Sequence, residues 1–324
     1  MALGIFRSAL IVLLPLLAAP RVAGAVESLA VTGWSIDLPT STPSGGAQTI
    51  AATILKPAGD GPFPAVVIMH DCSGLGARSS GAPRRWADVL APQGYVILIP
   101  DSFSSRSFPD GICTAPLDTP AERLRQVSPF FRAFDAYAAL AWLRAQPFVD
   151  GAHIGVMGGS HGGSTTLAAM VTPASSTGYL VQEKQHGFAA GIALYPGCSE
   201  QYAAWSVKRG PGTYGPVTEY IGVYRPIGPL LILIGEKDDW TPARDCAALA
   251  ARSRDAGLPV EIKIYPGAYH SFDGNSPVRY NPARRNFNKP DGQGATTGGD
   301  PAAWKDAIEQ VPAFFAKQLK PPAK

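Results

Sequence analysis

The stretch HIGVMGGSHGGSTTLAAM, residues 153–170, decides the fold of this 324-residue chain. Its first five residues are typical of a strand, and the run from Gly163 to Met170 is typical of a helix. Between them lies the pattern G-x-S-x-G, with Ser160 at its centre. A serine on a sharp strand-to-helix turn at positive φ needs neighbours without side chains, because strand and helix approach closely there. The glycines at 158, 159 and 162 meet that need, so we interpret the stretch as a nucleophile elbow.

Outward from this turn, short apolar and β-branched segments alternate with helical patterns, which is typical of a parallel sheet built from β-α units. Pro- and Gly-rich turns around the first two segments predict an antiparallel start. We predict one α/β domain over residues 26–324, with a mostly parallel eight-stranded sheet flanked by helices. The predicted strands are 31–38, 48–56, 65–69, 95–99, 153–157, 189–194, 230–234 and 260–264, and the predicted helices are 84–90, 130–146, 161–170, 242–256 and 301–319.

Two long stretches, residues 197–229 and 273–300, do not fit the alternation and are expected to be loop insertions. Loops of this length inside a compact domain are usually functional covers or mobile segments. The first is rich in aromatic residues and suits a wall over a binding cleft, whereas the second favours a solvated excursion. The aromatic residues are Tyr202, Trp205, Tyr214, Tyr220 and Tyr224, and the second stretch carries Arg279, Arg284, Arg285 and Lys289.

The N-terminus has the composition of a secretory signal peptide over residues 1–25. Arg7 supplies a short positive region, residues 9–19 are apolar, and Ala23-Gly24-Ala25 fits a small-residue cleavage site. A signal anchor is the alternative, but the apolar run is short for a membrane span. We therefore expect cleavage, no stable membrane association afterwards, and a periplasmic or secreted protein.

Charge and cysteine content narrow the classes of function. Removal of residues 1–25 lowers the formal net charge from +3 to +1, because two arginines lie in that segment. No basic stripe remains, so nucleic-acid binding has no support. After export the four cysteines would meet an oxidising compartment in which disulfides persist, with four buried free thiols as the alternative. No zinc-type spacing of Cys or His occurs, and we expect no metal and no cofactor.

Ser160 requires a base, because a serine hydroxyl is a poor nucleophile until its proton is removed. That base requires an acid to hold its tautomer. Among five histidines, His270 follows the last predicted strand, in the loop where this chain order places its base. The other histidines precede a strand, lie beside the serine, or belong to the loop after the third strand. They are His70, His153, His161 and His186.

The acid is expected after the strand 230–234, because the chain order of this architecture is Ser, Asp, His. The turn Gly235-Glu236-Lys237-Asp238-Asp239 supplies three carboxylates there. We favour Asp238, four residues before the helix that begins near Pro242, and keep Asp239 as the alternative.

A tetrahedral oxyanion needs two backbone donors. One normally comes from the residue after the nucleophile, here His161, and the other from the loop after the third strand. In that loop the amide of Cys72 is our candidate, and an ordinary glycine-containing loop is the alternative.

Five segments of the chain carry a family resemblance. They are VVIMHDCSG (66–74), PDSF (100–103), MGGSHGG (157–163), GEKD (235–238) and YPGAYHSF (265–272). Together they resemble the dienelactone hydrolase family, over about residues 48–272. The resemblance implies an α/β-hydrolase fold that cleaves an ester or lactone through an acyl-enzyme. The best-known members use cysteine as nucleophile where this chain has Ser160, which favours a general serine esterase over a dienelactone hydrolase proper.

The resemblance also implies two substrate-binding candidates. The family places an acidic residue in the oxyanion loop beside the nucleophile, and Asp71 has the similar position here. Members bind a substrate carboxylate through arginine, for which Arg106 is the nearby candidate.

The predicted sheet brings the cysteines to its carboxyl edge. Cys198 follows the strand that ends at Leu194, and Cys246 follows the turn that contains Asp238. Cys72 and Cys113 lie in the loops after the third and fourth strands. We predict the disulfides Cys72–Cys113 and Cys198–Cys246.

These observations predict an exported serine hydrolase of small-molecule esters or lactones, in which His270 activates Ser160 and Asp238 orients His270. A serine peptidase of the same fold is one alternative, although selecting peptides would need a propeller or a large cap. A catalytically silent binding protein on the same scaffold is another. The sequence leaves the natural substrate and the oligomeric state open.

Overall fold

An eight-stranded sheet forms the centre of the computed structural model, which describes Met1 and residues 29–171, 187–212 and 214–320. The strand order is β1-β2-β4-β3-β5-β6-β9-β10, and pairing is antiparallel only for β1 with β2 and β2 with β4. The predicted α/β-hydrolase fold and all eight strands are confirmed. The strands are β1 (Val31–Ser41), β2 (Ala47–Pro57), β3 (Phe63–Met69), β4 (Val96–Pro100), β5 (Val149–Gly159), β6 (Ala190–Leu194), β9 (Leu230–Gly235) and β10 (Val260–Tyr265).

Helices cover both faces of this sheet, and this explains why its central strands are continuous apolar runs. Every residue of β4, β6 and β9 is buried, whereas β1 at the edge is mostly exposed. The helices are α1 (Ala82–Leu90), α2 (Ala121–Arg125), α3 (Pro129–Arg144), α4 (His161–Met170), α5 (Ala243–Asp255) and α6 (Pro301–Leu319).

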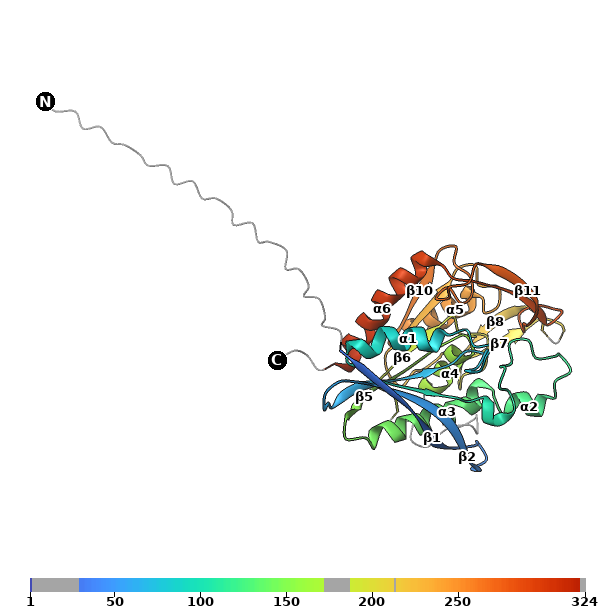
Figure 1. Cartoon of the computed structure of the whole chain (residues 1–324). Coiled ribbons are helices and arrows are strands. Elements are labelled where there is room, and N and C mark those ends of the chain that lie inside the picture. Colours follow the sequence, from blue (N-terminus) through green and yellow to red (C-terminus); the bar gives the residue numbers. More distant parts are fainter. Residues whose placement is uncertain (2–28, 172–186, 213, 321–324) are drawn as a thin grey trace.

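The helices divide into two groups, one on each face of the sheet (Figure 1). On one face α1 and α6 are in contact, with the Trp86 and Trp304 rings edge to face at 4.9 Å. On the other face Tyr137 of α3 donates a hydrogen bond to the carbonyl of Ala169 in α4. Local sequence signals define where these helices begin. Asp300, for example, accepts hydrogen bonds from the amides of the first turn of α6, as expected of an N-cap.

The two predicted loop insertions each contain a β-hairpin. β7 (Ser206–Arg209) pairs with β8 (Val217–Ile221), and β11 (Arg279–Arg285) pairs with β12 (Gln293–Thr297). The first insertion lines a pocket, as expected, through residues that include Glu200 and Arg209. The expectation that its aromatic residues form this wall is wrong, since none of them lines the pocket and three are fully buried in the core. They are Tyr202, Trp205 and Tyr224.

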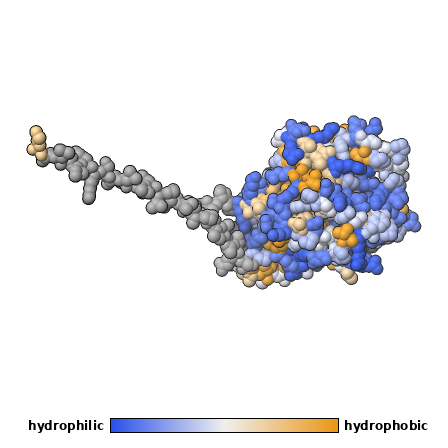
Figure 2. All heavy atoms as spheres, turned by 90° about the horizontal axis from the view of Figure 1, so that it is seen from above, coloured by the Kyte–Doolittle hydropathy of each residue, from blue (hydrophilic) through white to orange (hydrophobic). Residues whose placement is uncertain are grey.

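None of the described helices is both long enough and apolar enough to cross a membrane. Hydrophilic side chains dominate the face seen in Figure 2, and the apolar ones form separate patches. The large apolar side chains that are exposed come from distant elements, including Trp34 on β1, Ile221 on β8 and Tyr280 on β11. The predicted signal peptide and His186 lie outside the described residues, apart from Met1.

Candidate active site

Ser160 occupies the turn between β5 and α4 and is held there at φ 53° and ψ −120°. A non-glycine residue at positive φ is strained, and such strain clusters at functional sites. The glycines around it let three elements approach. A Cβ on Gly162 would lie 2.0 Å from the carbonyl oxygen of Met69 at the end of β3, and one on Gly158 would lie 2.5 Å from the Gly162 backbone. The turn therefore requires glycine at these positions, as the sequence predicts.

Three side chains that are distant in sequence form a line at the carboxyl edge of the sheet. His270 Nε2 lies 2.9 Å from Ser160 Oγ, and His270 Nδ1 lies 2.7 Å from Asp238 Oδ2. All three residues are buried, and His270 is completely so. A carboxylate only accepts, so the ring proton lies on Nδ1 and the lone pair of Nε2 faces the serine hydroxyl. This is the geometry of a nucleophile, a base and an orienting acid.

Asp238, and not Asp239, is the carboxylate that the structure brings to His270. Its Oδ1 accepts from the amides of Trp240 at 2.9 Å and Thr241 at 2.8 Å. The Thr241 hydroxyl contacts Asp238 Oδ2 at 2.9 Å and His270 Nδ1 at 3.0 Å. Asp239 instead accepts from Lys289 and from the Thr296 amide. Thr241 was not among the residues predicted from sequence; its position directly before Pro242 at the start of α5 is the available signal.

Two aromatic rings enclose the His270 imidazole. Tyr195 lies at 4.7 Å and Trp240 at 4.9 Å between ring centroids. The Tyr195 hydroxyl donates to Asp273 Oδ1 at 2.7 Å, and Trp86 Nε1 donates to the other oxygen of the same carboxylate at 2.8 Å. Burial raises the pKa of Asp273. The enclosure limits the rotation of His270 and shields its hydrogen bonds from water.

The two predicted oxyanion donors have the backbone environment that such a role requires. Within the described parts of the chain, neither the Cys72 amide nor the His161 amide donates a hydrogen bond to a protein atom. Both residues line the cleft beside Ser160. Buried amides are normally paired, so two unpaired amides beside a candidate nucleophile are suited to an incoming oxyanion.

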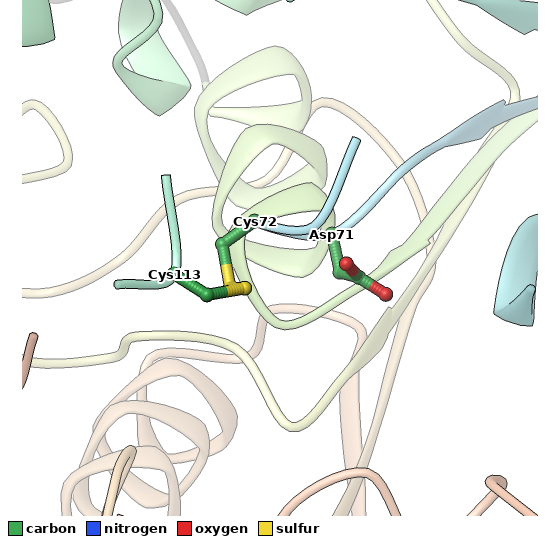
Figure 3. A group of neighbouring side chains, drawn as sticks. All are labelled: Asp71, Cys72 and Cys113. Atoms are coloured by element: carbon green, nitrogen blue, oxygen red, sulfur yellow. A yellow bond between two sulfur atoms is a disulfide. The ribbon is translucent and has the colours of Figure 1, made fainter. Parts of the chain in front are cut away.

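A disulfide between Cys72 and Cys113 fixes the loop that carries one of these amides, and Figure 3 shows it beside Asp71. The Asp71 carboxylate points away from the sulfur atoms and accepts hydrogen bonds from the Ser73 amide and the Ser80 hydroxyl. Asp71 and the two cysteines are close enough to suggest metal ligands. Disulfide sulfur offers no thiolate, however, so this group does not fit a metal. The second predicted disulfide, Cys198–Cys246, is also present.

Ser160 lies where two pockets meet, and Cys72, Cys113 and Trp240 also line both. The first, which we call the apolar pocket, has a volume of about 440 Å³. The second, the polar pocket, has a volume of about 380 Å³. The apolar pocket is lined by Ile112, Leu124, Phe130 and Phe287, and the polar pocket by Asp71, Arg78, Arg85 and Arg284.

Two sequence-based expectations about the cleft change with the structure. Arg106 is 6% exposed, forms a bidentate ion pair with Asp135 at 2.6 and 2.8 Å, and lines neither pocket. The structure therefore does not bring it to the site. The second insertion is exposed over much of β11, as a solvated excursion predicts, but it also contributes residues to both pockets, which was not expected. They include Asn281 and Arg284 in the polar pocket and Phe287 and Asn288 in the apolar pocket.

The apolar pocket also contains two titratable side chains whose protonation depends on burial. Burial raises the pKa of Glu200 to about 7, opposed by a hydrogen bond from Ser164. Burial and the neighbouring Arg132 hold the pKa of His161 well below its usual value. At neutral pH His161 is therefore uncharged, whereas Glu200 is near its midpoint.

Comparison with known proteins agrees with this geometry. The family model described as "Dienelactone hydrolase family" matches residues 50–319. The chain belongs to the dienelactone hydrolase family. A Bradyrhizobium protein described as "Probable 2-oxo-3-(5-oxofuran-2-ylidene)propanoate lactonase" is 26% identical over 233 residues, which cover 71% of this chain and 82% of that protein. Membership identifies a hydrolase that acts on esters or lactones.

Two solved structures share the fold. A Klebsiella pneumoniae protein described as a "Putative Dienelactone Hydrolase" is 20% identical, with a TM-score of 0.58 over 89% of this chain and 99% of that one. Apo Thermogutta terrifontis esterase 2 is also 20% identical, with a TM-score of 0.56 over 85% of this chain and 92% of that one. At these identities the likeness extends to the fold alone.

Proposed function

We propose that this member of the family is a serine esterase or lactonase, exported after removal of residues 1–25, with a single catalytic domain over residues 26–324. The carrying observation is the line of contacts from Asp238 through His270 to Ser160, at 2.7 and 2.9 Å. The description of the Bradyrhizobium relative as a lactonase supports the bond type. Two disulfides support export, because such bonds persist in oxidising compartments.

The reaction follows from the atoms present. His270 Nε2 removes the hydroxyl proton as Ser160 Oγ attacks the ester carbonyl, and the negative charge develops on the carbonyl oxygen. The amides of Cys72 and His161 donate to that oxygen. When the tetrahedral intermediate collapses, the imidazolium of His270 returns the proton to the leaving alkoxide. Water then attacks the acyl-enzyme by the same route, which releases the acid and restores Ser160.

The junction of the two pockets suits a small ester whose two sides differ in polarity. Because Ser160 lines both pockets, an ester carbonyl beside its Oγ directs one substituent into the apolar pocket and the other into the polar pocket. Volumes of about 440 and 380 Å³ hold small-molecule groups. We therefore propose a small-molecule ester or lactone as substrate.

Hydrolysis of p-nitrophenyl acetate by the mature protein and by Ser160→Ala tests the proposal. We expect kcat to fall by about 10³-fold or more in the variant, because only background hydrolysis and oxyanion binding remain. His153→Ala is the matched control, since His153 pairs with Asp150 outside both pockets. Turnover that is equal in Ser160→Ala and the unmodified protein would contradict the nucleophile assignment.

A further inference from the structure

Arg132 on α3 is an unusual feature of the core, because it is fully buried and has no ion pair in the described parts of the chain. Asp135 on the same helix binds Arg106 instead. Burial lowers the pKa of Arg132 to about 9. The charge of Asp135 acts on Arg132 in the opposite direction to burial, but within the described residues no carboxylate lies at ion-pair distance. A buried guanidinium without such a contact is costly, so the groups that do bind it are informative.

The hydrogen bonds of Arg132 connect it to the candidate active site. Arg132 Nη1 lies 2.6 Å from His161 Nδ1, and Nη2 donates to the carbonyl oxygen of His70 at 2.7 Å. The guanidinium also lies over the Phe103 ring at 4.9 Å. His161 directly follows Ser160, so a hydrogen bond from the core determines the state of the side chain beside the candidate nucleophile.

The Arg132 contact fixes the tautomer of His161. A guanidinium has five donors and no acceptor, so His161 Nδ1 must accept and its ring proton must lie on Nε2. Burial and the cationic neighbour disfavour the imidazolium and keep the ring neutral. Within the described residues, the only side-chain hydrogen bond of His161 is the one at Nδ1, and Nε2 has no partner. The result is an N–H donor that remains available.

His161 lines the apolar pocket together with Ile112, Leu124 and Phe130. The same pocket is also lined by charged side chains, including Glu200, Arg209 and Arg285. A ligand that offers an acceptor to the His161 N–H is favoured over a purely apolar one, because the apolar ligand would remove the donor's water without replacing the hydrogen bond. This side-chain donor is separate from the His161 backbone amide, the proposed oxyanion donor.

We propose that the His161 side chain is a specificity-determining donor to a keto or ether oxygen in the substrate group that enters the apolar pocket, and that Arg132 is the positioning residue that presents Nε2–H. The inference rests on the proposed function, since it names the substrate class of the same site. The preferred substrates are esters whose apolar substituent carries one oxygen acceptor.

Paired esters test the donor. The p-nitrophenyl esters of 3-oxo-, 4-oxo- and 5-oxohexanoate are compared with that of hexanoate, by kcat/KM, in the unmodified protein, His161→Phe and His161→Gln. We expect at least one keto ester to be preferred over hexanoate by about tenfold. His161→Phe should remove that preference, and His161→Gln, which retains an N–H donor, should restore part of it.

The ratio of two esters cancels any effect common to both, and His153→Phe is the control for loss of a histidine elsewhere. Equal changes for keto and apolar esters in His161→Phe, or no keto preference in the unmodified protein, would overturn the inference. Ser160→Ala separates the two proposals. One outcome is that turnover depends on Ser160 while the ratio of kcat/KM for keto ester and hexanoate is the same in the unmodified protein and His161→Phe. In that case the esterase proposal stands and the donor proposal fails.

The positioning role of Arg132 has a spectroscopic readout. In ¹⁵N-labelled protein, His161 should show a protonated Nε2 and an unprotonated Nδ1 between pH 6 and 8. Arg132→Met should release the ring to a mixture of tautomers. An Nδ1–H tautomer or an imidazolium in the unmodified protein at pH 7 would contradict the role. This measurement needs no turnover and remains decisive if Arg132→Met does not fold.

Discussion

Two imidazoles adjoin Ser160, and they are held by partners of opposite charge. His270 Nδ1 lies 2.7 Å from the carboxylate of Asp238, whereas His161 Nδ1 lies 2.6 Å from the guanidinium of Arg132. The acceptor places the His270 proton on Nδ1 and leaves Nε2 basic, and the donor leaves His161 with a proton on Nε2. The group bound at Nδ1 therefore decides the role of Nε2. A carboxylate at Nδ1 makes Nε2 a proton acceptor, and a guanidinium at Nδ1 makes Nε2 a hydrogen-bond donor.

Asp238→Asn should have the largest effect, because it removes the difference between the two imidazoles. An amide can donate to Nδ1, which would give His270 the tautomer of His161 and remove its basic Nε2. We expect kcat for p-nitrophenyl acetate to fall by about 10⁴-fold with little change in fold. Asp239→Asn is the matched control and should lower kcat less than about threefold, because Asp239 contacts Lys289 and Thr296 instead. A similar loss in both variants would refute the assignment of Asp238.

Removal of the Cys72–Cys113 disulfide should have the next largest effect. The double variant Cys72→Ala/Cys113→Ala frees the loop that carries a proposed oxyanion donor and should lower kcat by about tenfold or more. Cys198→Ala/Cys246→Ala is its control. The two bonds close loops of similar length, with sequence separations of 41 and 48, so each pair should lower the free energy of unfolding by about 2–4 kcal/mol.

Denaturant unfolding and steady-state kinetics measure the two effects separately. An equal loss of kcat in both double variants would mean that kcat depends on the overall stability of the protein and not on the position of the Cys72 loop.

Thr241→Val tests how precisely the His270 ring is oriented. The Thr241 hydroxyl contacts both Asp238 and His270 Nδ1, so its loss should leave the ring less well oriented. We expect kcat to fall by about tenfold while KM stays nearly constant, since the hydroxyl aids the reaction and not ground-state binding. A rise in KM with unchanged kcat would instead assign Thr241 to substrate binding.

Glu200→Gln tests whether Glu200, which lines the apolar pocket with His161, titrates near neutral pH. Its effect, measured on Tm, should be the smallest. Burial raises the Glu200 pKa from 4.5 to about 7, so the folded protein holds this proton more strongly than the unfolded chain. The associated stability is full below pH 4.5 and is lost as pH rises through about 7. The Tm of Glu200→Gln minus that of the unmodified protein should therefore increase between pH 5 and pH 8. A difference that is constant with pH would contradict this.

Patterns local to one segment made the scaffold predictable. Continuous apolar runs identified the buried strands, and the predicted helices 161–170 and 301–319 have the observed bounds. The chain order of Ser160, Asp238 and His270 was readable because each residue follows a strand of one parallel sheet. The hairpin of β11 and β12 was not, since β11 contains Pro282 and little apolar alternation, and its pairing depends on tertiary contacts.

The Arg132–His161 contact illustrates what sequence patterns miss. Arg132 lies on a helix whose apolar spacing predicts core packing, and Asp135 three residues later suggests a local ion pair. In the structure Arg106, from the loop after β4, occupies that carboxylate. Only the fold reveals which of two arginines is left to bind a histidine.

The same contact limits which residues this chain can accept at the position after Ser160. An apolar side chain at position 161 would leave a buried cation with only one backbone carbonyl to accept its hydrogen bonds. Substitutions at positions 132 and 161 should therefore be accepted together and selected against singly. Among homologues, these two positions are expected to covary, and a change in substrate preference would require two coupled mutations.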